Sequence, residues 1–137
     1  MSLSFREKSL WLMLASLVAV FGFYFSRALP ADGANVGPQQ TSLFIVAVVA
    51  LVVVQVIGHA AIAIADRRTE SDERDALIEL KGTRNGYFVL ATGVFASLCA
   101  ALVTNGNFVF MHVLLAFWVL AEIVSIASQL FLYRRGA

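Results

Sequence analysis

The chain is poor in charged residues, in proline and in cysteine. Only 14% of its 137 residues are charged, two are prolines, and the formal net charge is +1. A soluble domain usually carries about a quarter charged residues, so this shortage argues against a globule in water. The small net charge gives no reason to expect a nucleic-acid partner. The single cysteine, Cys99, excludes an internal disulfide and is expected to be a small core residue.

Sequence patterns of enzymes and metal sites are also missing. The two histidines, His59 and His112, lie in separate apolar runs, so no Cys/His cluster has the spacing of a metal site. No glycine-rich phosphate loop and no nucleophile elbow occurs. We therefore expect no enzymatic activity, no metal and no cofactor. His112, near the start of its run, is expected to extend toward the membrane interface.

Most of the chain consists of four long apolar runs. They cover residues 9–26, 42–65, 86–104 and 108–133, and 60% of all residues are hydrophobic. A helix needs about 20 apolar residues to cross a hydrocarbon core of about 30 Å. No proline interrupts the runs, and a segment in lipid must satisfy its own backbone hydrogen bonds, which favours helices over strands. The sequence predicts an all-α fold, a single domain over residues 1–137 with four transmembrane helices in a lipid bilayer.

The first run also has features of a secretory signal peptide, because Arg6 and Lys8 precede it. However, it is longer than a usual signal sequence, and it ends in the bulky stretch 21–25. Arg27 follows directly, with no small-residue cleavage site. We therefore expect the first helix to remain in the mature protein, with its aromatic end in the interfacial belt.

The basic residues lie on one side of the four runs. Nine of the ten Lys and Arg residues precede the first run, separate the second from the third or follow the fourth, and only Arg27 lies on the other side. Basic loops stay in the cytoplasm, so both termini are predicted to be cytoplasmic. The segments 28–41 and 105–107 are then outer connections, and the second is short enough to make the last two helices an antiparallel hairpin.

The predicted cytoplasmic loop, residues 66–85, is the most polar part of the chain. A short helix is expected there, capped by Ser71 or Asp72 and ended by Gly82, because the acidic residues come first and Lys81 comes last. Five basic and six acidic residues give a net charge of −1, which argues against a polybasic lipid-binding patch. The loop is either a solvated linker or a docking site for a cytoplasmic protein. The candidate docking residues are Asp72, Glu73, Arg74, Asp75, Lys81 and Arg84.

This loop also carries a resemblance to a known group of proteins. The string Asp72-Glu-Arg-Asp75, then Ile78, Lys81 and the Gly86-Tyr87 pair that opens the third run, resembles small bacterial inner-membrane proteins with four spans. The resemblance covers about 16 residues and the four-span layout. It implies a multi-pass protein of the bacterial inner membrane. That group has no assigned activity, so the resemblance gives no residue a role.

Five polar side chains lie inside the second and fourth runs: Gln55, His59, Glu122, Ser125 and Gln129. Counted from the same membrane edge, Gln55 and Glu122 lie at nearly equal depth close to mid-membrane, with His59 about one turn nearer the cytoplasm. A hydrogen bond from Glu122 to Gln55 or His59 is therefore allowed. Ionisable residues inside a span are costly and commonly functional.

Two interpretations of this polar cluster remain open. In the first, the cluster only fastens the second helix to the fourth, a contact that contributes about 0.6 kcal/mol on average and up to about 1.7 kcal/mol. The protein would then be a non-enzymatic accessory or regulatory subunit that acts through a membrane or cytoplasmic protein partner. In the second, Glu122 and His59 belong to a small proton- or cation-coupled transporter. Such a transporter would be built from several copies, because four helices enclose little volume.

The third run carries small residues at four-residue spacing. Gly93, Ser97 and Ala101 share one helical face, which allows a neighbouring helix to approach closely. The second run has a weaker version of this pattern in Ala61 and Ala65. We expect these faces to pack, either within the bundle or between copies of the chain.

The charge bias leads to a test of topology. Reporter fusions at Ala137 and within residues 70–75 should score as cytoplasmic, and a fusion within residues 33–39 should score as external, because basic segments are retained inside. Paired phosphatase and fluorescent-protein fusions measure this directly. A cytoplasmic score for 33–39 would contradict the four-span topology.

Overall fold

The computed structural model describes residues 3–29, 33–65 and 72–136. Within these ranges it contains no strand and four helices, α1 (Phe5–Ala28), α2 (Pro38–Ala65), α3 (Glu73–Val103) and α4 (Phe108–Arg135). The helices have 24 to 31 residues, and their most apolar windows have mean hydropathies of 1.8 to 2.6. At about 1.5 Å of rise per residue, each exceeds the roughly 30 Å of a hydrocarbon core. The all-α, four-helix prediction is confirmed.

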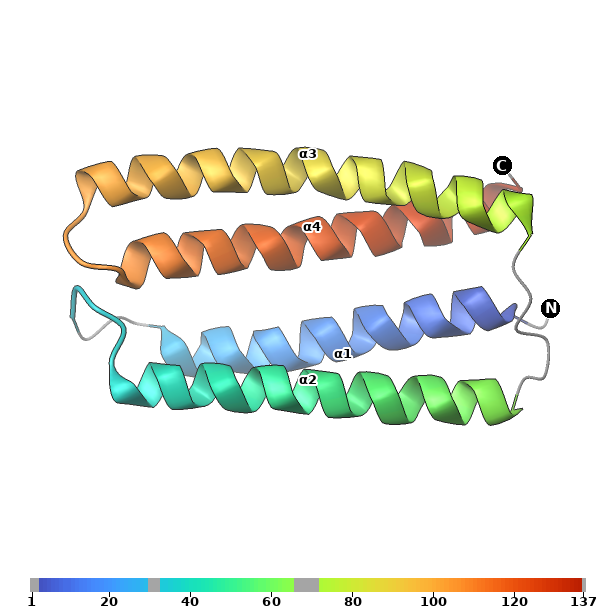
Figure 1. Cartoon of the computed structure of the whole chain (residues 1–137), viewed down its shortest axis with the longest axis horizontal. Helices are drawn as coiled ribbons and strands as arrows, with labels where there is room; N and C mark the ends of the chain where they lie inside the picture. Colours follow the sequence, from blue (N-terminus) through green and yellow to red (C-terminus); the bar gives the residue numbers. More distant parts are fainter. Residues whose placement is uncertain (1–2, 30–32, 66–71, 137) are drawn as a thin grey trace.

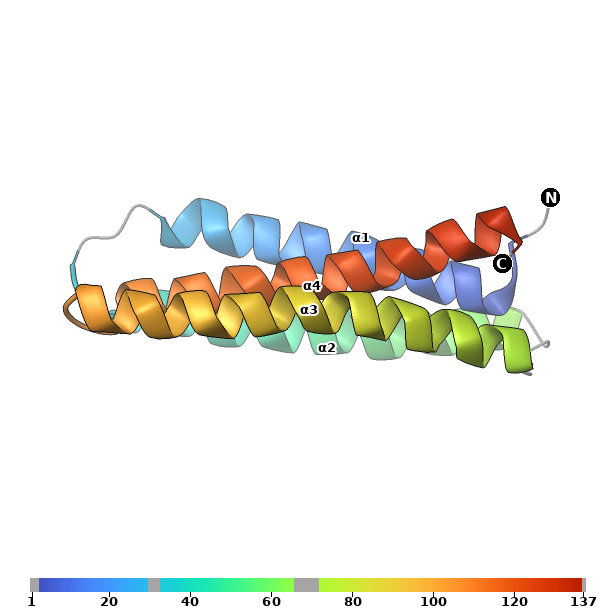
Figure 2. The same cartoon turned by 90° about the horizontal axis from the view of Figure 1, so that it is seen from above.

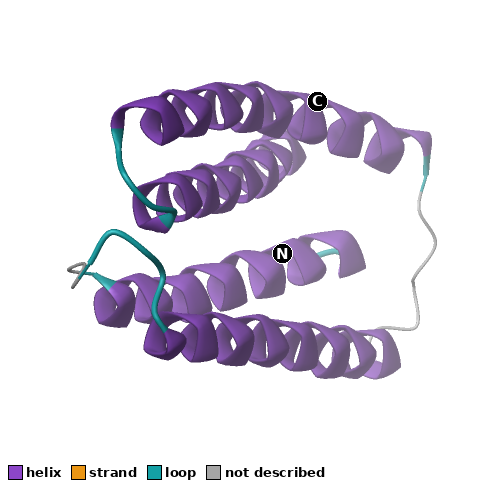
Figure 3. Ribbon diagram, turned by 60° about the vertical axis from the view of Figure 1, so that its left-hand side comes forward, coloured by secondary structure: helices purple, strands orange, loops and turns teal. Residues whose placement is uncertain are grey.

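The helices lie side by side in the order α3, α4, α1, α2 (Figure 1). α3 packs against α4, α2 packs against α1, and a contact between α1 and α4 joins the two pairs. All four run close to one long axis (Figure 2). The connection before α2 and the connection between α3 and α4 lie together at one end of the bundle (Figure 3), which we call the hairpin end. We call the other end, where α1 begins and α4 ends, the terminal end.

α3 combines two elements that the sequence predicts separately, the short helix of the loop and the third span from residue 86. Asp72 caps it, because its carboxylate accepts from the Asp75 N–H at 2.8 Å while the Asp75 side chain accepts from the Asp72 N–H at 3.2 Å. The expected end at Gly82 does not occur, since α3 continues unbroken to Val103. Residues 73–85, assigned by sequence to a loop, are therefore the first turns of the third spanning helix. Gly82 serves close packing instead, because a Cβ there would lie 2.4 Å from Cγ of Gln129.

Small residues on α3 bring its backbone close to α4. A Cβ on Gly93 would lie 2.1 Å from Cβ of Phe117, and a Cβ on Gly86 would lie 2.8 Å from the backbone oxygen of Ala121. Ser97, which belongs to the expected small-residue face, is 1% exposed, and its hydroxyl donates to the Gly93 carbonyl at 2.7 Å. Small side chains thus place α4 directly against the α3 backbone, as the pattern of small residues predicts.

Not all small residues pack in this way. Ala101 is exposed on α3, and Ala61 and Ala65 are exposed on α2. Cys99 is also exposed, so the expectation that it is a core residue is wrong. The helical face that carries Cys99 points away from α4, and a sequence run that is apolar on all sides does not reveal which face that is.

The buried core lies between α1 and α4. Towards the hairpin end, Leu17, Phe21 and Tyr24 of α1 pack near Val119 of α4. Towards the terminal end, a smaller cluster forms around Leu10, Ile126 and Leu130. In α2 the buried residue is Ala47, and the other faces of this helix expose valine and isoleucine side chains. Lipid is the environment that such an apolar surface requires.

The two connections at the hairpin end bind each other. The backbone N–H of Phe108 donates to the Ala34 carbonyl at 3.0 Å, and the N–H of Asn107 donates to Oδ1 of Asn35 at 3.2 Å. In return, Oδ1 of Asn107 accepts from the Val36 N–H at 2.8 Å. The first N–H groups of a helix have no partner within the helix. The loop before α2 supplies such partners at the start of α4. This arrangement fixes the spacing between the α1–α2 and α3–α4 pairs.

The close approach of α3 to α4 predicts a contrast among glycine substitutions. Gly93→Ala and Gly86→Ala should each destabilise the folded protein by about 1–3 kcal/mol, because the new methyl group overlaps atoms that cannot move away freely. Gly22→Ala is the control, since a Cβ there meets nothing within 4 Å. Alanine is the better helix former, so this variant should be neutral or slightly stabilised. Unfolding in detergent measures all three, and equal effects would contradict the packing described here.

Candidate functional site around Glu122

Glu122 is half-buried on α4, on the side that faces α1. It lies where two cavities meet. Its carboxylate makes no hydrogen bond and no ion pair with any residue that the structure describes. Carboxylates inside membrane proteins are normally paired, so Glu122 stands out among the polar groups of the bundle.

The first cavity, which we call the polar cavity, has a volume of about 220 Å³ and lies between α1, α3 and α4. At its terminal end lie Arg6 and Glu79, which form an ion pair at 3.2 Å. Glu122 is the residue of the lining that lies nearest the hairpin end of α4. Hydroxyl and amide groups line the space between, and these groups both donate and accept hydrogen bonds. They belong to Ser9, Thr83, Ser125 and Gln129.

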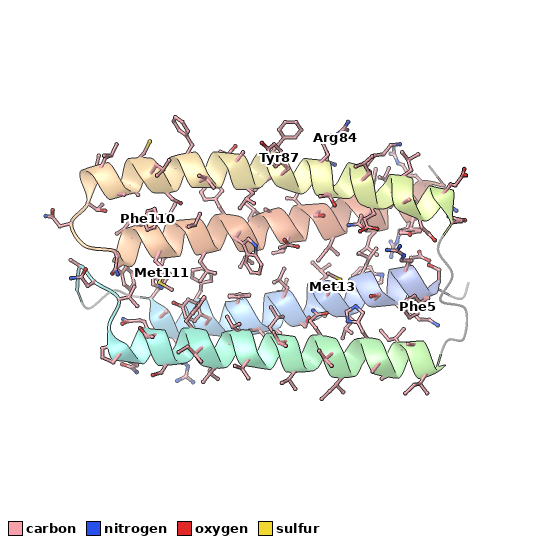
Figure 4. The ribbon with its side chains drawn as sticks, viewed as in Figure 1. Phe5, Met13, Arg84, Tyr87, Phe110 and Met111 are labelled. Carbon is pink, nitrogen blue, oxygen red and sulfur yellow. The ribbon has the colours of Figure 1, made fainter. Side chains whose placement is uncertain are left out.

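The second cavity, about 270 Å³, lies between α1, α2 and α4 and is mainly apolar. Leu17, Leu51 and Trp118 contribute to its wall, and Gln55 and Glu122 supply its polar groups. Met13 of α1 lines both cavities, and Figure 4 shows its side chain on the side of α1 that faces α4. Glu122 is thus the titratable group shared by a polar space and an apolar one.

The residues predicted to form one polar cluster are distributed over two places. Gln55 shares the apolar cavity with Glu122, but its amide donates to Oγ of Ser16 at 2.6 Å. His59 uses Nδ1 to bond the Gln55 carbonyl of its own helix at 2.7 Å. The hydrogen bond that the sequence allowed from Glu122 to Gln55 or His59 is therefore not formed. Counting residues along a helix predicts depth in the membrane but not rotation about the helix axis. In the structure α1 lies between α2 and α4, and Ser16 of α1 is the partner of Gln55.

Ser125 and Gln129, the other members of the predicted cluster, do lie on the side of α4 that carries Glu122. Both line the polar cavity with it. The Gln129 amide is 3.4 Å from Oγ of Ser125, a long hydrogen bond. These side chains therefore share a cavity with the carboxylate.

Two of the six residues predicted for the cytoplasmic loop, Arg74 and Asp75, attach α3 to α4. The Tyr133 hydroxyl donates to the Asp75 carboxylate, and Arg74 lies 5.9 Å from the Tyr133 ring centre and donates to its carbonyl at 3.4 Å. Asp72 and Glu73 form the first turn of α3. Lys81 and Arg84 lie further along, in a groove between α3 and α4. The acidic residues of this segment therefore contribute to holding the helix in place.

One buried polar pair was missed by sequence reasoning. His112 is 6% exposed, so the expectation that it extends toward the interface is wrong. Its Nδ1 bonds the Phe108 carbonyl at 2.9 Å, and its Nε2 lies 2.9 Å from the hydroxyl of Tyr24, which is fully buried. With Nδ1 donating, the neutral ring accepts the tyrosine proton at Nε2. The sequence did contain a signal for this pair, because Tyr24 and His112 lie at similar distances along the chain from the outer connections and therefore at similar depth in the membrane.

Comparison of the chain with protein-family models, with curated proteins and with solved structures found no match. The class of protein therefore follows from its helices alone. Four helices, each long and apolar enough to cross a bilayer, define an integral, multi-pass membrane protein. Within the residues that the structure describes, no group of three or more His, Cys, Asp or Glu side chains is arranged to hold a metal ion.

The Tyr24–His112 contact predicts a measurable coupling. Tyr24→Phe leaves His112 without its partner, and His112→Leu leaves a buried hydroxyl unpaired, so each single change should destabilise the protein. The double variant should lose less than the sum of the two, with a coupling free energy of about 0.6–1.7 kcal/mol. Equilibrium unfolding of the four proteins in detergent gives this value, and strictly additive losses would contradict the contact.

Proposed function

We propose that the protein is a non-enzymatic membrane subunit that binds a proton or a small cation at Glu122. The observation that supports this proposal is a half-buried carboxylate, at the junction of two cavities, that has no partner among the residues that the structure describes. An isolated charge in such a place is costly, so the group is neutralised by a proton or balanced by a cation. Nearby oxygen ligands from Ser125 and Gln129 are of the kind that hard cations prefer.

The ligand would enter from the terminal end. The polar cavity leads from Arg6 and Glu79 to Glu122 along hydroxyl and amide groups. Toward the hairpin end, the space between α1 and α4 is filled by Leu17, Phe21 and Val119, all at most 9% exposed. The positive charge bias predicts that the terminal end faces the cytoplasm, and the loop resemblance favours the bacterial inner membrane.

One-sided access favours an accessory or regulatory role. A ligand that binds and leaves by the same side changes the charge inside the bundle without crossing the membrane. That change can reach a partner through α3, because α3 lines the polar cavity and continues to the terminal end. A cytoplasmic or membrane protein that contacts this end of α3 would detect whether the site is occupied.

A small transporter is the second candidate. The apolar cavity favours it, because this space continues from Glu122 toward Gln55 on a different side of α1. Transport needs a second conformation in which the hairpin end opens, which would separate Tyr24 from His112. His59, the other residue predicted for this mechanism, does not line either cavity beside Glu122. The role of Glu122 in a transporter would therefore depend on Gln55 rather than on His59.

Replacement of the carboxyl group tests the binding proposal. Glu122→Gln keeps the shape of the side chain and its capacity for hydrogen bonds but cannot carry charge. The wild-type protein in detergent should change its melting temperature with pH or with added Na⁺ or K⁺ at constant ionic strength, because a ligand bound only to the folded state stabilises it. Glu122→Gln should fold and lack this response. Glu73→Gln is the control and should keep the response, since Glu73 is exposed in the first turn of α3 and lines neither cavity.

Flux in liposomes separates the two roles. In an accessory subunit, neither the wild type nor Glu122→Gln dissipates a proton or cation gradient, although the wild type keeps its ligand-dependent stability. In a transporter, the wild type dissipates the gradient and Glu122→Gln does not. An identical pH and cation response of the two proteins, with no flux from either, would contradict the proposed binding site.

A further inference from the structure

A second site lies on the surface of the bundle, in a groove between α3 and α4 near the terminal end. The groove has a volume of about 460 Å³ and is open to the surroundings. It does not share a lining residue with the two cavities at Glu122. Its main lining residues are Lys81, Arg84, Asn85, Ser128, Phe131 and Leu132.

The groove contains two cations, Lys81 and Arg84. Neither Lys81 nor Arg84 makes a hydrogen bond or an ion pair with any described residue. Two acidic residues of the same helix have partners elsewhere, because Glu79 pairs with Arg6 of α1 and Asp75 accepts from Tyr133 of α4. None of the described residues that line the groove is acidic. The groove therefore carries unbalanced positive charge, although the net charge of residues 66–85 is −1.

Neutral polar groups complete the groove. The Asn85 amide donates to Oγ of Ser128 at 3.1 Å, which joins α3 to α4 across it. Phe131 forms part of the wall, and the guanidinium of Arg135 lies 4.5 Å from the centre of its ring. A third cation therefore lies close to the groove. The site thus combines positive charge, hydrogen-bonding groups and an aromatic wall.

The depth of the groove matches the headgroup region of a bilayer. Arg84 and Thr104, which follows the last residue of α3, are separated by about 30 Å along the helix axis, and this is the thickness of a hydrocarbon core. Arg84 and Tyr87 point away from the bundle in Figure 4, toward the place that lipid occupies. Phe88, one turn further into the span, is 62% exposed and offers apolar surface directly below the cations.

We propose that this groove binds an anionic phospholipid, with its phosphate between Lys81 and Arg84. Basic side chains form charge-assisted hydrogen bonds with phosphate oxygens, and basic pockets between transmembrane helices are suited to anionic headgroups. Asn85 and Ser128 can bond the oxygen atoms of the headgroup or glycerol, and an acyl chain can lie along Phe88. A zwitterionic lipid fits less well, because its ammonium group finds no carboxylate in the groove.

The net charge of −1 for residues 66–85 argued against lipid binding, but a net charge sums the side chains on all faces of the segment. A helix separates its charges by face, and lipid meets one face only. On α3 the acidic groups Asp75 and Glu79 bond to side chains of the neighbouring helices α4 and α1, and Lys81 and Arg84 remain for the membrane. The net charge of the segment therefore does not describe the surface that a lipid contacts.

Lipid retention by the detergent-purified full chain tests this proposal. Native mass spectrometry should show that the wild type retains phosphatidylglycerol in preference to phosphatidylcholine with the same acyl chains. Lys81→Gln and Arg84→Gln should each weaken phosphatidylglycerol binding by roughly fivefold, and the double variant by roughly 25-fold. Lys81→Arg keeps the charge and should keep the preference. Arg134→Gln is the matched control, because it removes the same charge at the same end, where Arg134 lies over Trp11 of α1.

Three results would overturn the proposal. They are a wild type without preference for phosphatidylglycerol, an Arg134→Gln variant that loses as much as Lys81→Gln, and displacement of the lipid by millimolar inorganic phosphate. The last result would assign the groove to a free anion. Circular dichroism confirms that each variant is folded, and if the double variant does not fold, the two single variants decide the outcome.

Discussion

Each polar group inside hydrocarbon must find its partner within the protein, and this constraint determines most of the structure. Backbone groups meet it by forming helices. The helix ends meet it with caps, and the start of α4 depends on Ala34 and Asn35 from a distant loop. Buried side chains meet it in pairs, as Tyr24 and His112 do. Within this set, Glu122 is the exception that calls for a functional explanation.

The close contact between α3 and α4 sets the positions of the other side chains. The glycines of α3 remove side chains from this interface, so the α4 backbone lies against them and the bulky face of α4 turns toward α1. Glu122 lies on that face and therefore borders α1 instead of pairing directly with α2. The same contact leaves a groove on the lipid side, where Lys81 and Arg84 bond to none of the residues in 3–29, 33–65 and 72–136.

Two polar positions in the bundle differ in a way that bears on function. Near the hairpin end, Tyr24 and His112 satisfy each other and are packed among aromatic rings. Near the middle, Glu122 has free volume beside it and polar groups on the path to the terminal end. A satisfied pair in a packed core stabilises a fold, whereas an unsatisfied carboxylate beside a polar cavity is able to bind and release a ligand. This contrast favours a binding role for Glu122 over a purely structural one.

The sequence by itself determined the number of helices, the approximate bounds of all but the start of α3, and the lipid environment, because hydropathy and length are local properties. It also gave Asp72 as one of two candidate caps and Gly93 as a packing residue, since both signals depend on short spacings. Rotation about each helix axis was decided by the tertiary structure. Whether Gln55 meets Glu122 or Ser16, whether Gly82 ends α3 or packs in its interior, and which face the charges of α3 occupy all depend on that rotation. An apolar run that is uniform on every side carries no such information, because lipid and protein interior are equally apolar.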